Sequence, residues 1–417
     1  MSVQVYTTPS NSQVSKVWRK IQGDVAEALQ FECEEWGLLD RLDDQGLAWS
    51  LREVILPLDI TEGGRVSQIP ESGYETMPYT PNVEEITITP VQYNIRFAAS
   101  KLAMYIDKNG GDAMIENELK YRAKKEMESL ARAVSDDFYG FSTSILALTD
   151  TNITNGSATA TVTLKAGYGV AGISNTTFVA DKFRVNERVA FLLAGVYQQT
   201  GVINSLTSAG VMVVTLDAAA TITGPSIQIV RSNAVESTQT SYNRGLVGLL
   251  DVLTSASNFG LSSTSIANWS VAYSDTSTGR FSGTKMQIAK DQIMNYGGGK
   301  PDLCFIDQAV KRDLIQAERS ALRQTDPLNM QIDGDAKSRG VKWFSSRRVP
   351  PSYVAVVDSS GWKKWQLNPK PGTSFSWRDG KEPIDQNFLL FAGDFPLQLI
   401  PNNKKKFAYF SGQQGQS

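Results

Sequence analysis

The strongest periodic pattern in the chain lies between residues 112 and 140. Apolar residues recur there every three or four positions, which predicts one long amphipathic helix. They are Ile115, Leu119, Ala123, Met127, Leu130, Val134 and Phe138. Asp112 is placed to cap the start of this helix and Gly140 to end it. On the polar face, the pairs Glu116–Lys120 and Lys124–Glu128 have the spacing of ion pairs that support a helix.

Helical periodicity also appears in the segments 11–41, 245–253, 284–299 and 307–324. The last of them has Val310, Leu314, Ala317 and Leu322 on its apolar side. The third ends in three consecutive glycines, which predict a helix stop. A phosphate loop is disfavoured there, because the GxxxxGK[ST] pattern is absent. The segment PDLCFID, between these two helices, predicts a buried strand.

Residues 51–100 predict a long β-hairpin. LREVILPLDI on one side and EEITITPVQYNIRFAAS on the other have strand character, and the second alternates apolar with polar residues. Between them lies a polar segment with the turn residues Gly63 and Gly64. Because a two-stranded hairpin buries little on its own, we expect this one to rest on another surface, such as a neighbouring chain.

Residues 150–232 are rich in Thr, Val, Ser, Ala and Gly, and short β runs alternate there with turn residues. This pattern predicts a small inserted β-barrel or sandwich. A low-complexity surface loop is the alternative, and the density of β-branched residues argues against it. Further strands and turns alternate over 370–411. Predicted strands and helices alternate in some stretches and are grouped by type in others, so the predicted class is α+β rather than a doubly wound sheet.

Length and charge narrow the classes of function. The 417 residues suffice for two or three compact units, and 41% hydrophobic with 20% charged residues is an ordinary globular balance. Lys and Arg total 41 and Asp and Glu 43, for a net charge of −2. A protein that grips DNA through its phosphates normally carries a basic excess, so dominant nucleic-acid binding is not indicated.

Candidate chemistry is sparse. The chain has no His, which removes the commonest general base and metal ligand, and its two cysteines, Cys33 and Cys304, are far apart and predict buried free thiols. Ser100–Lys101 are adjacent, which is no productive spacing for a dyad. The polar N-terminus resembles no signal peptide, and no run reaches the roughly 18 apolar residues of a membrane helix. We expect no catalytic, cofactor or metal site and no enzymatic activity, in a protein made in solution in the bacterial cytoplasm.

Several charged and aromatic clusters have both a functional and a plain interpretation. Four acidic clusters could do acid–base work or bind a metal, but solvated surface or cap positions are favoured for them: Glu34–Glu35, Asp40–Asp43–Asp44, Glu84–Glu85 and Asp136–Asp137. Asp333 and Asp335 do not meet the calcium-loop pattern, so a turn is favoured there. The basic spots Arg347–Arg348 and 404–406 are assigned to the surface, while contact with DNA or with acids of a neighbouring chain stays open. Trp18, Trp36, Trp343, Trp362 and Trp365 are expected to anchor the core or an interface.

The order of these parts resembles the major capsid proteins of tailed bacteriophages, the fold named after phage Hong Kong 97. The resemblance covers essentially the whole chain and rests on order and proportion, since the family has no short diagnostic motif. It implies an N-terminal arm (1–50), an E-loop hairpin (51–97), a peripheral domain (98–149) with a spine helix (112–140), an inserted β domain (150–232), an axial domain (233–365) and C-terminal strands returning to the peripheral domain (366–417).

The resemblance further implies a subunit that assembles as hexamers and pentamers into an icosahedral shell around double-stranded DNA. The shell would contact the packaged DNA non-specifically. Each E-loop would lie over a neighbouring subunit, which makes Arg52, Glu62, Arg65, Glu71 and Glu75 candidate interface residues. Trp18, in the arm, is a further candidate. Some members of the family crosslink an E-loop Lys to an Asn of a neighbour. This chain has no Lys between Lys20 and Lys101, so we expect a shell without such isopeptide crosslinks.

Other partners follow from the same resemblance. The first predicted helix begins within about a dozen residues, without a long charged leader, so we expect a separate scaffolding protein. A portal and decoration proteins are further expected partners. Three alternatives stay open: an encapsulin-like nanocompartment shell, another virion protein of the tail or baseplate, and a hydrolase. The β insertion argues against the first, the long helix between a hairpin and a mixed domain against the second, and the absence of His against the third.

Overall fold

The structure is a computed structural model, and it describes residues 34–39, 48–50, 53–59, 83–100, 112–140, 145–150, 152–153, 159–165, 176–218, 221–224, 226–232, 246–264, 266, 269–322, 337–338, 340–366, 376–381 and 388–414. The chain divides into two compact units. The first comprises Met1–Leu42, Val91–Phe138 and Lys364–Gln398, and the second comprises Asp43–Pro90, Tyr139–Lys363 and Leu399–Ser417. Helices and sheets occur together, as the sequence predicted.

The first unit is built on one long strand, β20 (Phe388–Pro401), whose last three residues belong to the second unit. β4 (Val91–Ser100) and β19 (Ser376–Lys381) pair with it in antiparallel register, and β18 (Trp362–Gln366) completes the sheet. β4 alternates as predicted, with Val91 and Ile95 buried and the polar residues between them largely exposed. A short helix, α2 (Glu34–Gly37), is the described part of the predicted helix 11–41.

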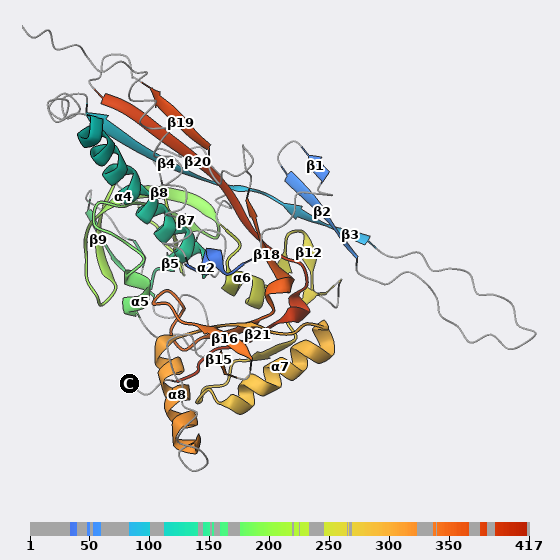
Figure 1. The fold of residues 1–417 in the computed structure, drawn as a ribbon. Coiled ribbons are helices and arrows are strands. Elements are labelled where there is room, and N and C mark those ends of the chain that lie inside the picture. Colours follow the sequence, from blue (N-terminus) through green and yellow to red (C-terminus); the bar gives the residue numbers. More distant parts are fainter. Residues whose placement is uncertain are drawn as a thin grey trace, which may run out of the picture. The chain divides into compact units, whose positions relative to one another are not determined.

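The long helix predicted from residue 112 is α4 (Asp112–Phe138), which lies against β4 (Figure 1). Its described apolar stripe is buried, namely Ala123, Met127, Leu130, Val134 and Phe138. The expected partner of Glu128 was wrong: its carboxylate pairs with Lys125 at 2.8 Å, three residues away, while Lys124 is exposed. Both spacings place the two side chains on one helix face, so periodicity alone could not separate them.

The predicted hairpin begins as a small antiparallel sheet of β1 (Ala48–Ser50), β2 (Glu53–Asp59) and β3 (Val83–Ile88). The pairing of β2 with β3 runs from Val54 opposite Ile88 to Asp59 opposite Val83. Ile86 and Ile88 are buried while Glu84 and Glu85 are exposed. The strands on either side of the polar segment therefore pair as the alternation predicted.

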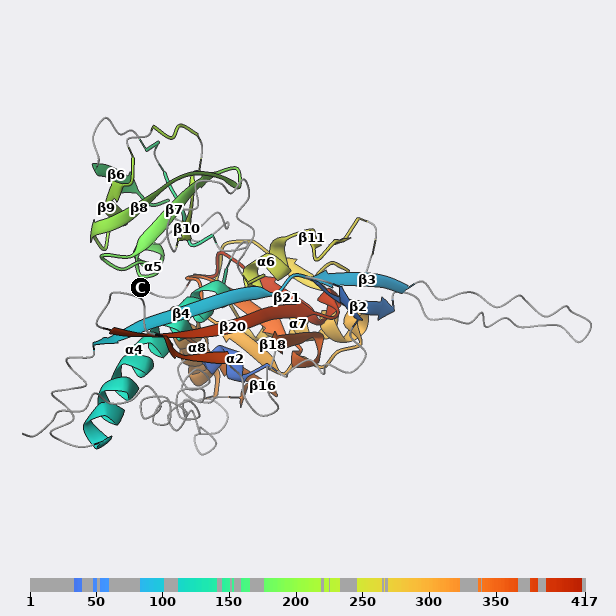
Figure 2. The same ribbon diagram turned by 90° about the horizontal axis from the view of Figure 1, so that it is seen from above.

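A six-stranded sheet contains the β runs predicted within 150–232 (Figure 2). Its strands follow the order β5 (Ala147–Leu148), β10 (Gln228–Arg231), β7 (Arg188–Leu193), β8 (Val196–Leu206), β9 (Val211–Leu216) and β6 (Thr159–Thr163). Thr149, just after β5, bridges Leu164, just after β6, and Lys165 N donates to Leu148 O at 2.8 Å. These contacts join the two edge strands, so the sheet closes into a small barrel.

The interior of this barrel follows from the period-two pattern of its strands. Ala160 and Val162 of β6 and Met212, Val214 and Leu216 of β9 alternate with more exposed residues. β7 and β8 are joined by the two-residue turn Ala194–Gly195, in which both residues have positive φ. Turns of this kind match the twist of the two strands. One short helix, α5 (Thr176–Ala180), precedes β7.

Like the barrel, the other six-stranded sheet belongs to the second unit, and its strands are partly parallel and partly antiparallel. Its order is β13 (Tyr273–Asp275), β21 (Phe407–Phe410), β17 (Val354–Val357), β14 (Leu303–Ile306), β16 (Val341–Phe344) and β15 (Lys337–Ser338). β13 runs parallel to β21 and β14 parallel to β16, while the other neighbours are antiparallel. β11 (Ser257–Asn258) and β12 (Leu261–Ser262) form a separate two-stranded ribbon.

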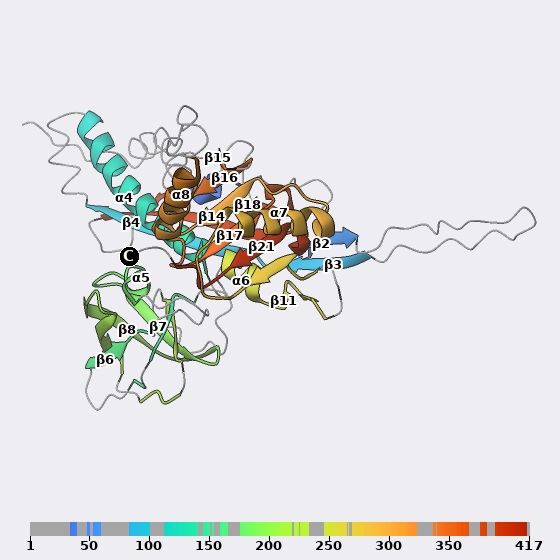
Figure 3. The ribbon, with the colours of Figure 1, turned by 90° about the horizontal axis from the view of Figure 1, so that it is seen from below.

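Both faces of this sheet are buried. On one face lie α7 (Gly283–Gly297) and α8 (Gln308–Leu322) (Figure 3), whose Met286, Ile293 and Leu314 share one apolar cluster with Cys304 and Val356 of the sheet. Aromatic rings fill the other face. Phe305 lies 6.1 Å from Tyr139 and 6.4 Å from Trp362, which lies 6.3 Å from Phe407. A short helix, α6 (Leu249–Thr254), contacts β21.

Helices α7 and α8 form where the sequence predicted them, and one residue of the predicted apolar side of α8 differs. α7 ends at Gly297, and Gly298 follows in the left-handed conformation at φ 60°, so the glycine run is a helix stop. In α8, Val310 and Leu314 are buried, but Ala317 is exposed and Ile315 packs against the core in its place. The predicted apolar side of α8 is therefore confirmed at Val310 and Leu314 and wrong at Ala317. No helix in the described ranges is long and apolar enough to span a membrane.

We expect Met127→Ala in α4 to lower the free energy of unfolding by about 2 to 4 kcal/mol, because the thioether side chain is completely buried and its removal leaves a cavity. Lys124→Ala, three residues earlier and exposed, should change it by no more than about 0.5 kcal/mol. Urea denaturation of the unassembled chain measures both. Equal losses for the two variants would contradict the placement of α4.

Candidate functional site

The six residues predicted at an interface, Trp18, Arg52, Glu62, Arg65, Glu71 and Glu75, all lie outside the described residues. Four of them fall between β2 and β3, which end as the pair Asp59 and Val83. In the sequence, the 23 residues 60–82 connect these two paired strands. The assignment of these residues to an interface stays a prediction.

The best-defined polar arrangement in the described structure surrounds Lys404, which the sequence assigned to the surface. That assignment is wrong: Lys404 is only 1% exposed. Its Nζ donates to the carbonyl oxygen of Ser255 at 3.0 Å and to Oδ1 of Asn258, and it lies 5.4 Å from the centre of the Trp269 ring. A buried ammonium needs such partners, because its desolvation is otherwise costly.

A carboxyl group completes this cluster. Asn258 Nδ2 donates to Asp251 Oδ2 at 3.0 Å, so the Asn258 carboxamide lies between the amine of Lys404 and the carboxyl of Asp251. Burial raises the pKa of Asp251 to about 6, against the lowering influence of Lys404 and of the Asn258 hydrogen bond. Burial lowers the pKa of Lys404 to about 8, partly offset by Asp251. Removal from water therefore disfavours the charged form of both groups.

Local structure explains why Lys404 points inward while its neighbours do not. Residues 404–406 form the 3-10 turn η3, with Asn403 as its cap accepting from Lys405 N at 2.9 Å. Lys405 Nζ donates to Ser270 Oγ at 2.9 Å and Lys406 Nζ to Ser360 Oγ at 2.8 Å. The three lysines are adjacent in sequence, yet the turn points their side chains in different directions. Lys404 therefore binds a carbonyl and an amide oxygen, while Lys405 and Lys406 each bind a different serine hydroxyl.

Glycines allow the backbone of η3 to lie close to α7. A Cβ on Gly297 would lie 2.3 Å from Lys405 O, and one on Gly361 would lie 2.8 Å from Cβ of Lys406. Asp358 fixes the same corner, since it is 5% exposed and accepts from the backbone N–H groups of Lys300 and Ser360, each at 2.9 Å. The glycine run thus serves close packing as well as ending the helix.

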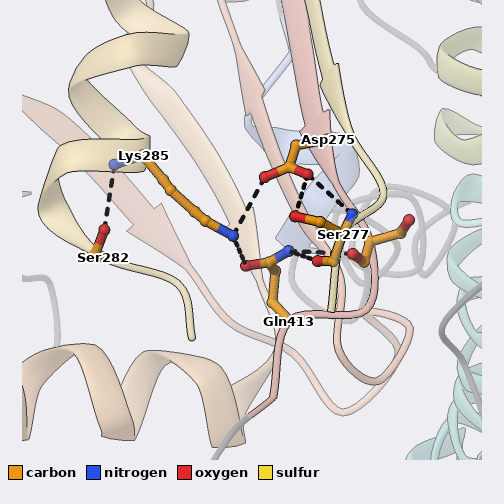
Figure 4. A network of polar contacts seen from close by, with 6 residues as sticks. Asp275, Ser277, Ser282, Lys285 and Gln413 are labelled. Carbon is orange, nitrogen blue, oxygen red and sulfur yellow. Dashed lines mark hydrogen bonds and ion pairs between the residues drawn. The ribbon is translucent and has the colours of Figure 1, made fainter. Parts of the chain in front are cut away.

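A second polar network holds the end of the described chain (Figure 4). Lys285 Nζ lies 3.2 Å from Asp275 Oδ2 and donates to Gln413 Oε1 at 2.8 Å. Gln413, which is fully buried, donates from Nε2 to the carbonyl oxygens of Ser277 and Ser411, each at 3.1 Å. Hydrogen bonds from Ser277 and then Lys285 lower the pKa of Asp275. The network ties the segment after β21 to β13 and α7.

The other candidate residues have structural surroundings. Glu84 and Glu85 are exposed as predicted, whereas Glu35, Asp136 and Asp137 are buried, so their assignment to solvated surface was wrong. Tyr93 Oη donates to Asp137 Oδ2 at 2.5 Å, which supplies the partner that a buried carboxylate requires. The clusters 40–44 and 333–335, Lys101, Cys33, Trp18 and the Trp36 side chain lie outside the described residues.

The remaining candidates are core residues. Trp343, Trp362 and Trp365 are buried. Cys304 is a buried free thiol, as predicted, and burial raises its pKa to about 12. Within the described ranges no group of His, Cys, Asp or Glu is arranged to hold a metal ion. Sequence reasoning missed Asp251, Asn258 and Gln413, because Asn258 is 146 residues from Lys404 and no local pattern connects them.

The chain has no sequence match among known protein families. No family model matches it, and no curated protein does. Solved structures do match. A chain of the cyanophage A-1(L) capsid asymmetric unit aligns with a TM-score of 0.50 at 9% identity, covering 91% of this chain and 93% of that one. The capsid of a native GTA particle aligns with a TM-score of 0.46 at 11% identity (92% and 91%), and a virus-like particle from Pyrococcus furiosus with 0.38 at 8% (94% and 98%). The first of these shows that the chain shares the fold of that capsid subunit.

We expect Gly297→Ala to lower the free energy of unfolding by about 1 to 3 kcal/mol, because its methyl group would overlap the backbone of η3. The exposed Asn295→Ala on the same helix should change it by no more than about 0.5 kcal/mol. Thermal and urea unfolding of both variants measure the difference. A Gly297→Ala variant as stable as the parent would contradict the close approach of η3 to α7.

Proposed function

We propose that this protein is the major capsid protein of a tailed bacteriophage, which self-assembles as hexamers and pentamers into an icosahedral shell around double-stranded DNA. The observation that carries the proposal is the shared fold with the cyanophage capsid subunit, which extends over 91% of this chain and 93% of that one. A likeness over nearly the whole of both chains supports a common architecture rather than one shared module. The protein would then reside in the virion.

The elements of the structure can be assigned to parts of such a subunit. α4 would be the spine helix and, with the sheet of β4, β20 and β19, would form the peripheral domain. β2 and β3 would be the base of the E-loop. The mixed sheet with α7 and α8 would form the axial domain, and the six-stranded barrel would be the inserted β domain.

The role proposed here is structural rather than catalytic. The near-neutral net charge of −2 suits a subunit that must pack beside many copies of itself. Contacts with DNA would be non-specific, and a separate scaffolding protein, a portal and decoration proteins would be its partners. The connection 60–82 would lie over a neighbouring subunit and place Glu62, Arg65, Glu71 and Glu75 at that interface, with Trp18 and Arg52 as further contacts.

Electron microscopy of the chain, expressed alone and with a candidate scaffolding protein from the same genome, tests the proposal. We expect closed shells, or rings of five and six subunits, since heterologous interfaces that close make rings. A monodisperse monomer under both conditions would refute self-assembly. A variant in which Asn-Gly replaces 60–82 tests whether this connection is needed for assembly. Asp59 and Val83 are opposite each other, so a two-residue turn can join them. This variant should fold but form no closed shells.

A denaturing gel tests how the shell is held together. Intact particles boiled in denaturant should run as a single monomer band, because the connection 60–82 contains no Lys for a bond to a neighbour. Particles treated beforehand with a chemical crosslinker provide the positive control for a ladder. A ladder of multimers from untreated particles would show that covalent links join the subunits.

A further inference from the structure

The cluster of Asp251, Asn258 and Lys404 brings together three groups that can react with one another: an amine, a carboxamide and a carboxyl. Nothing in the assembly role of the chain uses them. They come from three separate elements, α6, β11 and the turn η3, all within the second unit. Lys404 and Asn258 are 1% and 8% exposed, so the amine and the carboxamide meet almost out of contact with water.

The arrangement has an order that matters for chemistry. Lys404 Nζ contacts Oδ1 of Asn258, which is bonded to the electrophilic carbon Cγ. Nδ2 of the same carboxamide, the group that would leave, is 3.0 Å from Asp251 Oδ2. Ser255 O, 3.0 Å from Nζ, holds the amine in place, and the Trp269 ring covers it at 5.4 Å. The nucleophile thus contacts the oxygen of the carboxamide, and the proton carrier contacts its nitrogen.

We propose that Lys404 and Asn258 join in an intramolecular isopeptide bond, with Asp251 as the catalytic residue that transfers the proton. The neutral amine of Lys404 attacks Cγ of Asn258, and a bond forms between Nζ and Cγ. The bond between Cγ and Nδ2 then breaks. One proton from Nζ passes through the Asp251 carboxyl group to Nδ2, which leaves as ammonia. Asp251 ends in its starting protonation state, and the reaction needs no oxidant, reductant or activating cofactor.

Burial favours the reactive forms of the two groups. An amine attacks only when it is neutral, and a solvated lysine is almost fully protonated at neutral pH. Desolvation lowers the pKa of Lys404 to about 8, which increases the fraction of free amine. Desolvation also raises the pKa of Asp251 to about 6, so the carboxyl can carry a proton near neutral pH. Fixed contact between reacting groups supplies the effective concentration that an uncatalysed aminolysis lacks.

This bond differs from a crosslink between subunits. It joins two residues of one chain, so it produces no ladder on a denaturing gel and is compatible with a shell held without inter-subunit links. It does not rest on the capsid assignment. Its mechanical effect would be to fasten the turn before the last strand, β21, to the segment after α6, closing a covalent loop from residue 258 to 404.

Mass spectrometry of the purified full-length chain, and of assembled particles where they form, tests the bond. The intact mass should be lower than the sequence mass by one ammonia. Trypsin should release peptide 245–280, which contains Asn258, joined to a peptide that begins at 382 and continues past Lys404, because a linked lysine is no longer cleaved. Recovery of 245–280 and of a peptide ending at Lys404 as separate linear species in every preparation would overturn the proposal.

Three variants locate the reaction. Lys404→Arg and Asp251→Asn should each restore the full sequence mass and release linear peptides, whereas Lys405→Arg, whose parent side chain binds Ser270 instead, should keep the link. A linked Asp251→Asn variant would overturn the role of Asp251. The parental peptide map decides the bond itself, so a variant that fails to fold leaves that test intact. The linked parent should also unfold at a higher temperature than Lys404→Arg.

Discussion

The second unit depends on one constraint, the burial of both faces of its mixed sheet. The central strands β14 and β17 are buried at every position, and β21 at all but Tyr409, so their alternating side chains need apolar cover on both sides. Helices α7 and α8 provide it on one face and a group of aromatic rings on the other. β21 is the last strand in the described part of the chain and lies between β13 and β17, so the sheet is complete only when this segment has been inserted.

That insertion explains why polar side chains gather around the ends of β21. The turn before it, η3, and the residues after it must approach apolar elements, and their backbone and side-chain groups lose water as they do so. Lys404 is matched by a carbonyl, an amide and an aromatic ring at one end, and Gln413 by Lys285 and two carbonyls at the other. The glycines 297 and 361 remove the side chains that would keep η3 away. A covalent bond at Lys404 would make the first of these fastenings permanent.

The described elements outside the mixed sheet are stabilised in different ways. The barrel is closed on itself, so its strands leave no open edge, and its interior is filled by its own alternating residues. The hairpin base is a three-stranded sheet at the start of a long connection. In the first unit, α4 packs its apolar stripe on β4, and Tyr93 satisfies a buried carboxylate in the last turn of the helix.

Much of the local structure could be predicted from the sequence, because its signals are short in range. Periodicity placed α4 and α7 within about two residues, the triple glycine ended α7, and alternation marked the strands of the hairpin and the barrel. The predicted surface positions of Lys404, Asp136 and Asp137 were wrong, because all three are buried. A charged residue is assigned to the surface unless its partners are known, and the partners of Lys404 and Asp137 come from distant parts of the chain.

The sequence by itself determined where helices and strands form and which of their faces are apolar, because these depend on residues three or four positions apart or on alternate positions. Only the tertiary structure decided that Asp251, Asn258 and Lys404 meet, since strand order and the path of the C-terminal segment bring residues 146 positions apart into contact. The reactivity proposed for them is a property of that contact and of the water excluded from it, and neither is encoded in any one segment of the chain.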